Sequence, residues 1–376
     1  MEFFLILAGA GIVFLLERFV CSRFWDKGLS VSVRFPEKPA EEGDEAVLTE
    51  VIENRKILPL PWLNVKFRIS RNLRFSTMEN TSTSDWNYKS DVFSILSGQR
   101  ITRRLTFGCG KRGYYTIGQA DCISADLLMT STMVRTYAQH THFYVYPKAA
   151  DISSLDIPFR RMIGTVTARQ MLYEDPFEFR GLRDYAPTDP MSRINWKATA
   201  RTGQMLVNLH DSTASREAVI FLNVEDETVW QYSQLHEEGI RLASALCRRL
   251  LAENIPTRLY SNGIDMLTGS AAMLPAGSGN RQMDTINELL ARIDLTQPCV
   301  PGIRQVKEAD ASDLPDFPLF IMISSCQRED LAAAFRSLCA KGCSGLWIAP
   351  LHADMPLRVA ASPGMDVIRW EVEKNA

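Results

Sequence analysis

The side chains with the most obvious chemistry lie close together in residues 179–201, FRGLRDYAPTDPMSRINWKATAR. This segment holds four arginines, one lysine, two aspartates, one tyrosine and one tryptophan among small and turn-forming residues. It is too charged for a core strand and lacks the even alternation of a surface strand. Three roles fit such a composition: catalysis, nucleic-acid binding, or a structural clasp between two parts of the chain.

Catalysis and nucleic-acid binding are the weaker interpretations. The segment contains neither histidine nor cysteine, so it offers no pair of nucleophile and base. His210, Asp211 and Ser212 follow it, but neighbours in sequence do not make a triad, because triad members meet in space. Binding to nucleic acid needs cations interleaved with exposed aromatic rings. Because Asp184 and Asp189 offset the arginines and the whole chain has a formal charge of -2, we expect no nucleic-acid partner.

The clasp is therefore the preferred interpretation. The planar guanidinium of arginine suits bidentate, partly buried contacts with carboxylates and carbonyl groups. Asp189 is placed to bond backbone amides in the turn YAPTDP or to cap a helix over PMSRINWKATA. Trp196 is expected to pack in the seam between two domains, and the same edge can bind a partner protein. The residues assigned to this site are Arg183, Tyr185, Asp189, Arg193, Trp196 and Arg201.

Two folded regions flank the clasp. In residues 28–148, short alternating strands such as LSVSVRF, LNVKFRIS and THFYVYP are separated by turn-forming residues, which predicts an all-β sandwich domain. Residues 149–215 form the connecting region that contains the clasp. In residues 216–376, apolar strands alternate with helical segments, a pattern typical of an α/β, doubly wound (Rossmann-like) domain with a parallel sheet.

The helical patterns of the α/β region cover about 228–253, about 281–293 and QREDLAAAFRSLCAKG, which ends at Gly342. The glycine-rich GSAAMLPAGSGN is expected to be a loop. It has neither the spacing Gly-x-Gly-x-x-Gly after a strand nor a Gly-Lys-Ser/Thr sequence, so no nucleotide cofactor is expected.

The N-terminus is strongly apolar. Residues 3–16, FFLILAGAGIVFLL, carry no charge and are followed by Glu17, Arg18 and the apolar FVC. Counted on to Cys21, with Arg18 reaching toward the headgroups, the segment nearly has the 20 or so residues that a membrane span needs. A cleaved signal peptide is the alternative, but no basic residue precedes the stretch and no small-x-small cleavage site follows it. Arg18, Arg23 and Lys27 lie on its C-terminal side, which by the positive-inside rule places the bulk of the chain in the cytoplasm. We therefore expect a single-pass anchor helix over residues 1–24 in the cell membrane.

The cysteines are scattered and several lie in apolar segments, as in a protein with reduced, buried thiols rather than a disulfide framework. Cys339 and Cys343 are four residues apart, but no second Cys/His pair lies near them, so a zinc site is not expected. The eight cysteines are Cys21, Cys109, Cys122, Cys247, Cys299, Cys326, Cys339 and Cys343.

The arginine-rich segment resembles the signature of a bacterial family, domain of unknown function 58, which is related to von Willebrand factor A domains. That signature reads Arg-x-Tyr-x-x-Gly-Asp, then Arg-x-Ile-x-Trp, then a small residue before Ala-Arg. Thr188 stands where glycine is usual. The preceding KRGYYTIGQADCISADLL and FYVYP are also similar to the β region of the family. The matching signature residues are Arg183, Tyr185, Asp189, Arg193, Ile194, Trp196, Thr199, Ala200 and Arg201.

This resemblance implies a von Willebrand A-like α/β domain in a membrane-anchored, non-enzymatic scaffold or adaptor. Members of the family are commonly encoded beside MoxR-type AAA+ ATPases and transglutaminase-like proteins. Both are therefore expected partners, in a chaperone-like or maturation complex. The resemblance implies no reaction, and the oligomeric state stays open.

A von Willebrand A domain can bind Mg²⁺ through an Asp-x-Ser-x-Ser sequence after its first strand and an Asp from a later loop. Here an asparagine and two glutamates stand at the first three positions, and serines stand at the later one. Long glutamate side chains would crowd an ion that demands octahedral oxygen ligands, so we expect a degenerate site without metal. The alternative left open is a divalent-metal-dependent adhesion module or hydrolase that uses the acidic loop of residues 225–227. The positions concerned are Asn223, Glu225, Glu227, Ser324 and Ser325.

Overall fold

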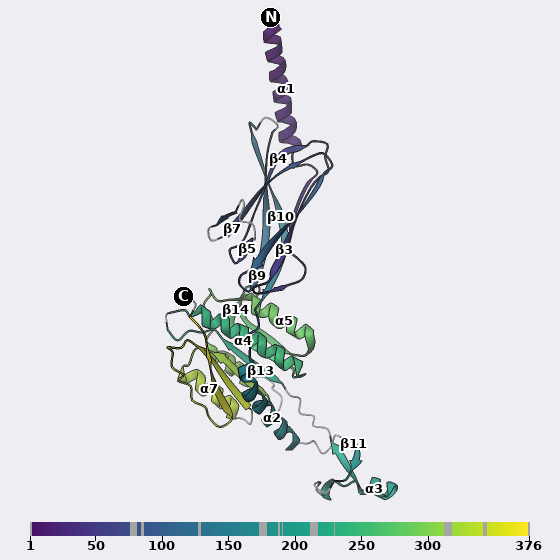
Figure 1. Cartoon of the computed structure of the whole chain (residues 1–376), viewed down its shortest axis with the longest axis vertical. Helices are drawn as coiled ribbons and strands as arrows, with labels where there is room; N and C mark the ends of the chain where they lie inside the picture. Colours follow the sequence, from purple (N-terminus) through teal and green to yellow (C-terminus); the bar gives the residue numbers. More distant parts are fainter. Residues whose placement is uncertain are drawn as a thin grey trace. The chain divides into compact units, whose positions relative to one another are not determined.

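The chain divides into two compact units, Met1–Lys148 and Ala149–Ala376. The structure is a computed structural model, shown as a cartoon in Figure 1. The first unit contains a helix and two β-sheets, and the second contains a sheet with helices on both faces and a small two-stranded sheet. The residues described are 2–75, 81–83, 86–126, 129–172, 179–186, 189, 191–210, 217–228, 230–311, 318–340 and 344–374.

Helix α1, Glu2–Phe24, opens the first unit. Among the residues that the structure describes, no helix is long and apolar enough to cross a membrane. The predicted single-pass anchor over residues 1–24, and with it the placement of the chain at the cytoplasmic face of the cell membrane, is therefore wrong. The uncharged apolar stretch of residues 3–16 ends before the charged Glu17, whereas a span needs about 20 apolar residues.

Two sheets form the rest of the first unit. One has the strand order β1-β3-β8-β5 and is antiparallel, and the other has the order β2-β10-β9-β4-β7-β6, in which only β2 pairs in parallel. Buried and exposed residues alternate along the strands, as the two-residue period of a strand dictates when one face is covered. The strands are β1 Leu29–Arg34, β2 Ala40–Glu41, β3 Glu45–Asn54, β4 Leu60–Ser70, β5 Leu73–Phe75, β6 Thr81–Thr83, β7 Trp86–Ile95, β8 Arg100–Cys109, β9 Gly113–Ala125 and β10 Thr132–Tyr146.

Aromatic rings fill part of the space between these sheets. Phe35 stacks on Phe143 with ring centroids 5.4 Å apart, and Phe107 meets Phe143 edge-on at 5.7 Å. All three side chains are buried. Such offset and edge-to-face pairs add to the stabilisation that comes from burying the rings.

The main sheet of the second unit has the order β15-β14-β13-β17-β18-β19, with β16 paired to β14. Strands β14, β13, β17, β18 and β19 are parallel, but β15 and β16 run antiparallel to β14. The strands are β13 Ala218–Asn223, β14 Thr257–Asp265, β15 Ala271–Gly277, β16 Ile293–Asp294, β17 Leu319–Ser324, β18 Ser344–Leu351 and β19 Met365–Glu371.

The predicted fold class is therefore wrong for the sheet as well as for the anchor, because the sheet is mixed and not wholly parallel. The glycine-rich segment expected to be a loop forms β15, which turns back from β14 as a hairpin. A hairpin needs only a short turn, whereas a parallel pair needs a long crossover, and too few residues separate these two strands for a crossover helix.

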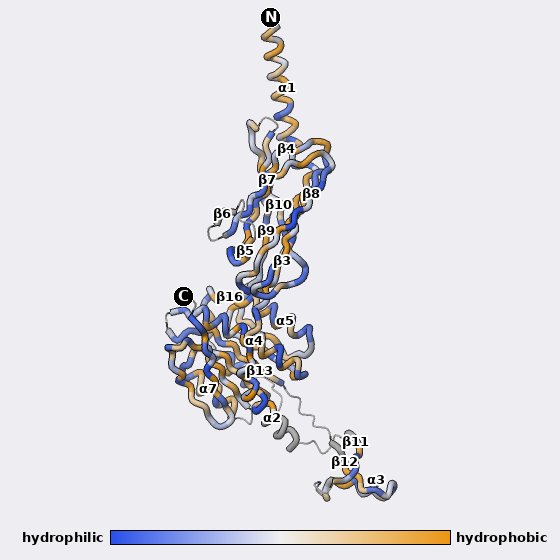
Figure 2. The backbone as a smooth tube through the Cα atoms, in the orientation of Figure 1, coloured by the Kyte–Doolittle hydropathy of each residue, from blue (hydrophilic) through white to orange (hydrophobic). Residues whose placement is uncertain are grey.

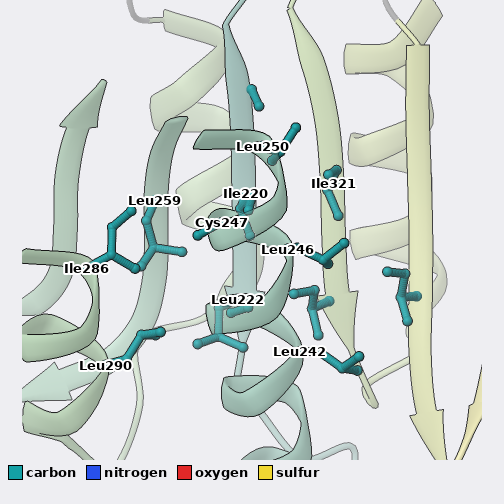
Figure 3. Close-up of a cluster of buried hydrophobic side chains, with 14 of the residues drawn as sticks. Ile220, Leu222, Leu242, Leu246, Cys247, Leu250, Leu259, Ile286, Leu290 and Ile321 are labelled. Carbon is teal, nitrogen blue, oxygen red and sulfur yellow. The ribbon is translucent and has the colours of Figure 1, made fainter. Parts of the chain in front are cut away.

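Helices cover both faces of this sheet. Side chains of α2, α4 and α5 join one hydrophobic cluster, and those of α6 and α7 join another. Every residue of β13 is buried: Ile220 and Leu222 point into the first cluster, and Val219 and Phe221 into the second. Figure 3 shows Ile220 and Leu222 against the leucines of α4. The helices are α2 Asp156–Leu172, α4 Ser233–Ala252, α5 Gly279–Arg292, α6 Gly302–Ala311 and α7 Glu329–Ala340.

The seven cysteines that the structure describes are free thiols, and six of them are buried. Cys343, the second member of the pair considered for zinc, lies outside the described residues. Burial raises the pKa of the thiols of Cys109 and Cys326 to about 11 and that of Cys122 to about 12. These thiols therefore stay protonated at neutral pH.

A group of charged side chains lies between the two sheets of the first unit. Glu50 on β3 and Lys89 and Asp91 on β7 are each 1% exposed. Arg103 on β8 is paired with Glu50 in the strand register and lies 2.9 Å from Asp91, while Lys89 lies 3.6 Å from Asp91. None of the four oxygens of Glu50 and Asp91 accepts a hydrogen bond within the described part of the chain.

Burial makes ionisation of Glu50 costly. Loss of hydration, and secondly the nearby Asp91 carboxylate, raise the pKa of Glu50 from 4.5 to about 7, although Arg103 and Lys89 act in the opposite direction. The Cys122 thiol on β9 also faces this carboxyl group. Glu50 is therefore largely protonated at mildly acidic pH and loses its proton near neutrality.

We predict that the first unit loses stability as the pH rises from 5 to 8. A carboxyl group whose pKa is raised in the folded state stabilises the fold at pH values below its unfolded pKa. This stabilisation is lost as the pH rises through the folded pKa, and for Glu50 the loss is about 3 kcal/mol at most. Glu50→Gln should remove most of this dependence, because glutamine stays neutral. Urea denaturation across this pH range measures the effect.

Glu53→Gln is the matched control, since Glu53 lies on the same strand, is partly exposed and pairs with Arg55. Its unfolding free energy should vary with pH as that of the wild type does. Equal pH dependence in Glu50→Gln and wild type would contradict the assignment to Glu50.

Candidate functional site

The residues described within 179–210 form a small module within the second unit. Strand β11, Phe179–Asp184, pairs antiparallel with β12, Leu206–His210. Between them lie the 3-10 turn η2, Met191–Arg193, and helix α3, Trp196–Thr202. The predicted single helix over PMSRINWKATA is thus two shorter pieces. His210 ends β12, and Asp211 and Ser212, the other members of the triad considered above, lie outside the described residues.

The arginine–carboxylate pair at the centre of the module is local. Arg183 donates from both terminal nitrogens to the two oxygens of Asp189, each at 2.6 Å. Asp189 also accepts a hydrogen bond from the backbone of Ala186 at 2.9 Å. The pair therefore closes the turn between β11 and η2 inside the segment itself.

Helix α3 is capped by a residue that the sequence analysis did not assign. Asn195 accepts a hydrogen bond from the Ala198 amide at 2.9 Å and donates to Asn208 on β12 at 2.7 Å. Thr199 accepts from the Leu206 amide at 3.1 Å, which ties the helix to β12. An asparagine before a helix is a strong N-cap signal, so this assignment could have been made from the sequence.

The other signature residues do not share one environment. Tyr185 is half-buried, and Arg201 is exposed. Trp196 is 61% exposed, so it is not packed into the interior of its own unit. Arg193 ends η2. A clasp between the two units stays a prediction.

The second candidate site lies at the carboxyl ends of the parallel strands. Asn223, the last residue of β13, donates to the hydroxyl of Ser324 at the end of β17 at 2.9 Å. Its oxygen accepts from Asn262 on β14 at 2.6 Å. All three are buried, and a Cβ on Gly302 would lie only 2.6 Å from the Asn223 oxygen. Ser324, rather than Ser325, is thus the serine that meets Asn223.

The two glutamates of the acidic loop have arginine partners. Glu225 accepts from the Gly302 amide at 2.8 Å and forms an ion pair with Arg328 at 3.0 Å. Glu227 accepts from the backbone of Gln327 and pairs with the guanidinium of Arg358. These arginines come from loops about a hundred residues further along the chain, and no spacing in the sequence indicated them.

Asp226 is held by the helix that follows it. It accepts from the Tyr232 amide at 3.2 Å and bonds the Nε2 atom of His236 at 2.8 Å. A cavity of about 250 Å³ lies beside this pair and is also lined by Cys299. Burial and the charge of Glu225 raise the pKa of the Cys299 thiol, which is the opposite of what a nucleophilic cysteine needs.

These residues do not fit a Mg²⁺ ion. Two of the carboxylates that would be its ligands bind guanidinium groups, and the third binds a histidine. Within the described ranges, no group of three or more His, Cys, Asp or Glu side chains is arranged to hold a metal. A second cavity, of about 190 Å³, lies beside Glu227, Ser325 and Arg358.

We predict that Arg183→Ala and Asp189→Ala loosen the module without unfolding the chain. Arg183 is 40% exposed, so each change should cost about 1–2 kcal/mol locally, less than a fully buried pair would. Amide hydrogen exchange in residues 179–210 should accelerate in both variants. Arg201→Ala, which removes an exposed cation, is the control and should leave the exchange rates unchanged. Unchanged exchange in Arg183→Ala and Asp189→Ala would contradict the prediction.

We predict that Mg²⁺ leaves the melting temperature of the wild type unchanged, because its would-be ligands are occupied. Glu225→Ala should lower stability by about 1–3 kcal/mol with or without Mg²⁺, since it strands the Gly302 amide and Arg328. Asp330→Ala removes the exposed second partner of Arg328 and serves as control. A Mg²⁺-dependent rise in melting temperature that Glu225→Ala abolishes would instead support the metal-dependent alternative.

Comparison with known proteins assigns the chain to no family. No family model matches the chain, and no curated protein matches it, so the resemblance to domain of unknown function 58 and to von Willebrand factor A domains gains no support from them. Among the solved structures that match, the three described next each cover about a third of the chain. The CARDB domain of the PF1109 protein from Pyrococcus furiosus, in complex with di-metal ions, is 14% identical over 32% of this chain and 91% of its own, with a TM-score of 0.21.

Two further matches are of the same kind. Domains D2 and D3 of the major pilin SpaD from Corynebacterium diphtheriae are 9% identical over 33% of this chain and 57% of theirs, with a TM-score of 0.23. The seventh ScaB type I cohesin from Pseudobacteroides cellulosolvens is 15% identical over 32% of this chain and 95% of its own, with a TM-score of 0.21. At these TM-scores the likenesses carry no argument about function.

Proposed function

We propose that this chain is a non-enzymatic interaction protein that engages a MoxR-type AAA+ ATPase. The observation that supports this best lies at the carboxyl edge of the main sheet. Open α/β sheets bind their ligands where the strand order reverses, which here is between β13 and β17. At that point the polar side chains bond one another, as Asn223 does with Ser324 and Glu227 with Arg358. Because these groups are engaged with one another, the arrangement favours an interaction role over a reaction at this edge.

A catalytic role is less well supported. Catalysis needs a nucleophile, acid or base that can reach a substrate with a suitable pKa. The nearest arrangement is His236 with Asp226 beside Cys299, but His236 is 5% exposed and the pKa of Cys299 is raised. Both features oppose thiolate chemistry.

The identity of the partner follows from the resemblance of the arginine-rich segment. Members of that family are encoded beside MoxR-type ATPases and transglutaminase-like proteins, so the chain would act as an adaptor between such proteins. Exposed Trp and Met side chains on the second unit, among them Trp196 at 61% exposure, also favour protein contacts.

The test is retention of an identified ATPase on the tagged full-length chain. Extracts of the cells that produce the chain are passed over it with ATP, with ADP and without nucleotide, and retained proteins are identified by mass spectrometry. We expect a MoxR-type AAA+ ATPase to be retained in a nucleotide-dependent manner and to be displaced by excess untagged chain. Binding of the purified ATPase then confirms direct contact. A folded chain that retains no AAA+ ATPase in any nucleotide state would contradict the proposal.

A further inference from the structure

We infer that the partner docks on the module of residues 179–210, and that the segment it presents is an acidic stretch of protein bearing large apolar side chains. This inference rests on the proposed function, and it adds the surface and the chemistry of the partner. It is carried by the side chains that the module leaves exposed.

Most of the large apolar side chains described in the module lie on its outside. Ile194 and Val207 are buried and pair across a β-bridge. By contrast, four large apolar side chains are exposed, and Trp and Met are among the residue types enriched in protein interfaces. Figure 2 shows hydrophobic and hydrophilic residues intermixed in this part of the chain. The exposed fractions are 41% for Leu182, 60% for Met191, 61% for Trp196 and 40% for Met205.

Helix α3 presents two neighbouring stripes to the outside. Trp196 and Ala200 are four residues apart and share a face, and Lys197 and Arg201 share the adjacent face. All four residues are exposed. The inner face of the helix faces β12, which Thr199 contacts. The helix thus offers a tryptophan beside two cations.

The cations of this stripe are uncompensated. Lys197 and Arg201 have no ion-pair partner in the described part of the chain, whereas Arg183 neutralises Asp189. Over residues 179–210 the sequence has five Lys and Arg residues against two Asp, within a chain of formal charge -2. A basic surface of this kind attracts an acidic partner and disfavours a basic one.

A protein segment fits this surface better than nucleic acid. Platforms for single-stranded nucleic acid stack successive bases on several aromatic rings. Trp196 is the one exposed aromatic ring described in the module, since Tyr185 is half-buried, and its exposed companions are Leu and Met. The Arg183–Asp189 pair and the Asn195 cap also hold the surface in shape before binding, which reduces the entropy lost on association.

The test measures binding of labelled probes to the full-length chain by fluorescence anisotropy. The probes are a short peptide of glutamate and leucine, the same peptide with lysine in place of glutamate, and a single-stranded oligonucleotide of matched length. The test variants are Trp196→Ala and the double variant Lys197→Glu with Arg201→Glu. Trp230→Ala and Lys307→Glu are matched controls, because they alter an exposed tryptophan and an exposed lysine elsewhere in the second unit. Circular dichroism confirms that each variant is folded.

We expect the acidic peptide to bind the wild type and both controls equally, and each test variant about tenfold more weakly. Added salt should weaken the binding, since the charges are exposed. Preference for the basic peptide or the oligonucleotide, or equal binding by test and control variants, would overturn the inference. So would a concentration-dependent dimer that Trp196→Ala abolishes, because the occupant would then be a second copy of the chain.

The purified AAA+ ATPase separates this inference from the proposed function. If the ATPase binds wild type and both test variants equally, the proposed function stands and the docking surface is wrong. If the ATPase does not bind but the acidic peptide does so in a Trp196-dependent manner, the surface stands and the ATPase assignment fails.

Discussion

The side-chain amide of Asn223 joins the ends of three neighbouring strands, and the arrangement of the carboxyl edge depends on it. Its nitrogen bonds Ser324 on β17 and its oxygen bonds Asn262 on β14. A carboxylate at this position could accept from Asn262 but could not donate to Ser324. Because the group is buried, each unpaired partner would cost about 1–3 kcal/mol. The Asn223 side chain also leaves no room for a side chain on Gly302. The backbone amide of Gly302 in turn donates a hydrogen bond to Glu225.

The carboxylates above this amide illustrate one way to stabilise negative charge at a sheet edge. Glu225 and Glu227 each combine a backbone amide with a guanidinium group, and these contacts tie together the loops after β13, β17 and β18. The buried carboxyl groups of the first unit have a different environment. Glu50 and Asp91 lie buried between two sheets, beside Lys89 and Arg103. Loss of hydration, and secondly the Asp91 carboxylate, raise the pKa of Glu50 in spite of these cations.

The small module of residues 179–210 has to hold its shape with few buried side chains. A two-stranded sheet alone is marginally stable, and Ile194 and Val207 are the buried apolar side chains among those described in the module. Short polar contacts make up the difference: the bidentate pair of Arg183 with Asp189 and the cap from Asn195. This arrangement leaves Trp196 exposed, which supports the interaction role proposed for the module.

Local patterns in the sequence determined much of the secondary structure of this protein. The alternation in LNVKFRIS predicts β4 because side chains of a strand point to opposite faces in turn, and the apolar period before residue 253 predicts α4 because one face of a helix recurs every 3.6 residues. Helices α2 and α6 and the antiparallel course of β15 were missed, since short or weakly patterned segments take their form from what they pack against. The membrane span predicted at the start of the chain was wrong, because the uncharged stretch of residues 3–16 is shorter than the 20 or so residues that a span needs.

The two candidate sites also differ in how far the sequence alone could predict their contacts. Arg183 and Asp189 are six residues apart, so their pairing was within reach of the sequence, although it closes a local turn where a contact between domains was expected. The partners of the acidic loop were not within reach. Arg358 lies 131 residues from Glu227, and the two meet only because parallel strands bring their carboxyl ends to one edge of the sheet. The sequence by itself determined which residues carry charge and which segments form strands and helices. Only the tertiary structure decided which charges meet, because that depends on the path of the chain between them.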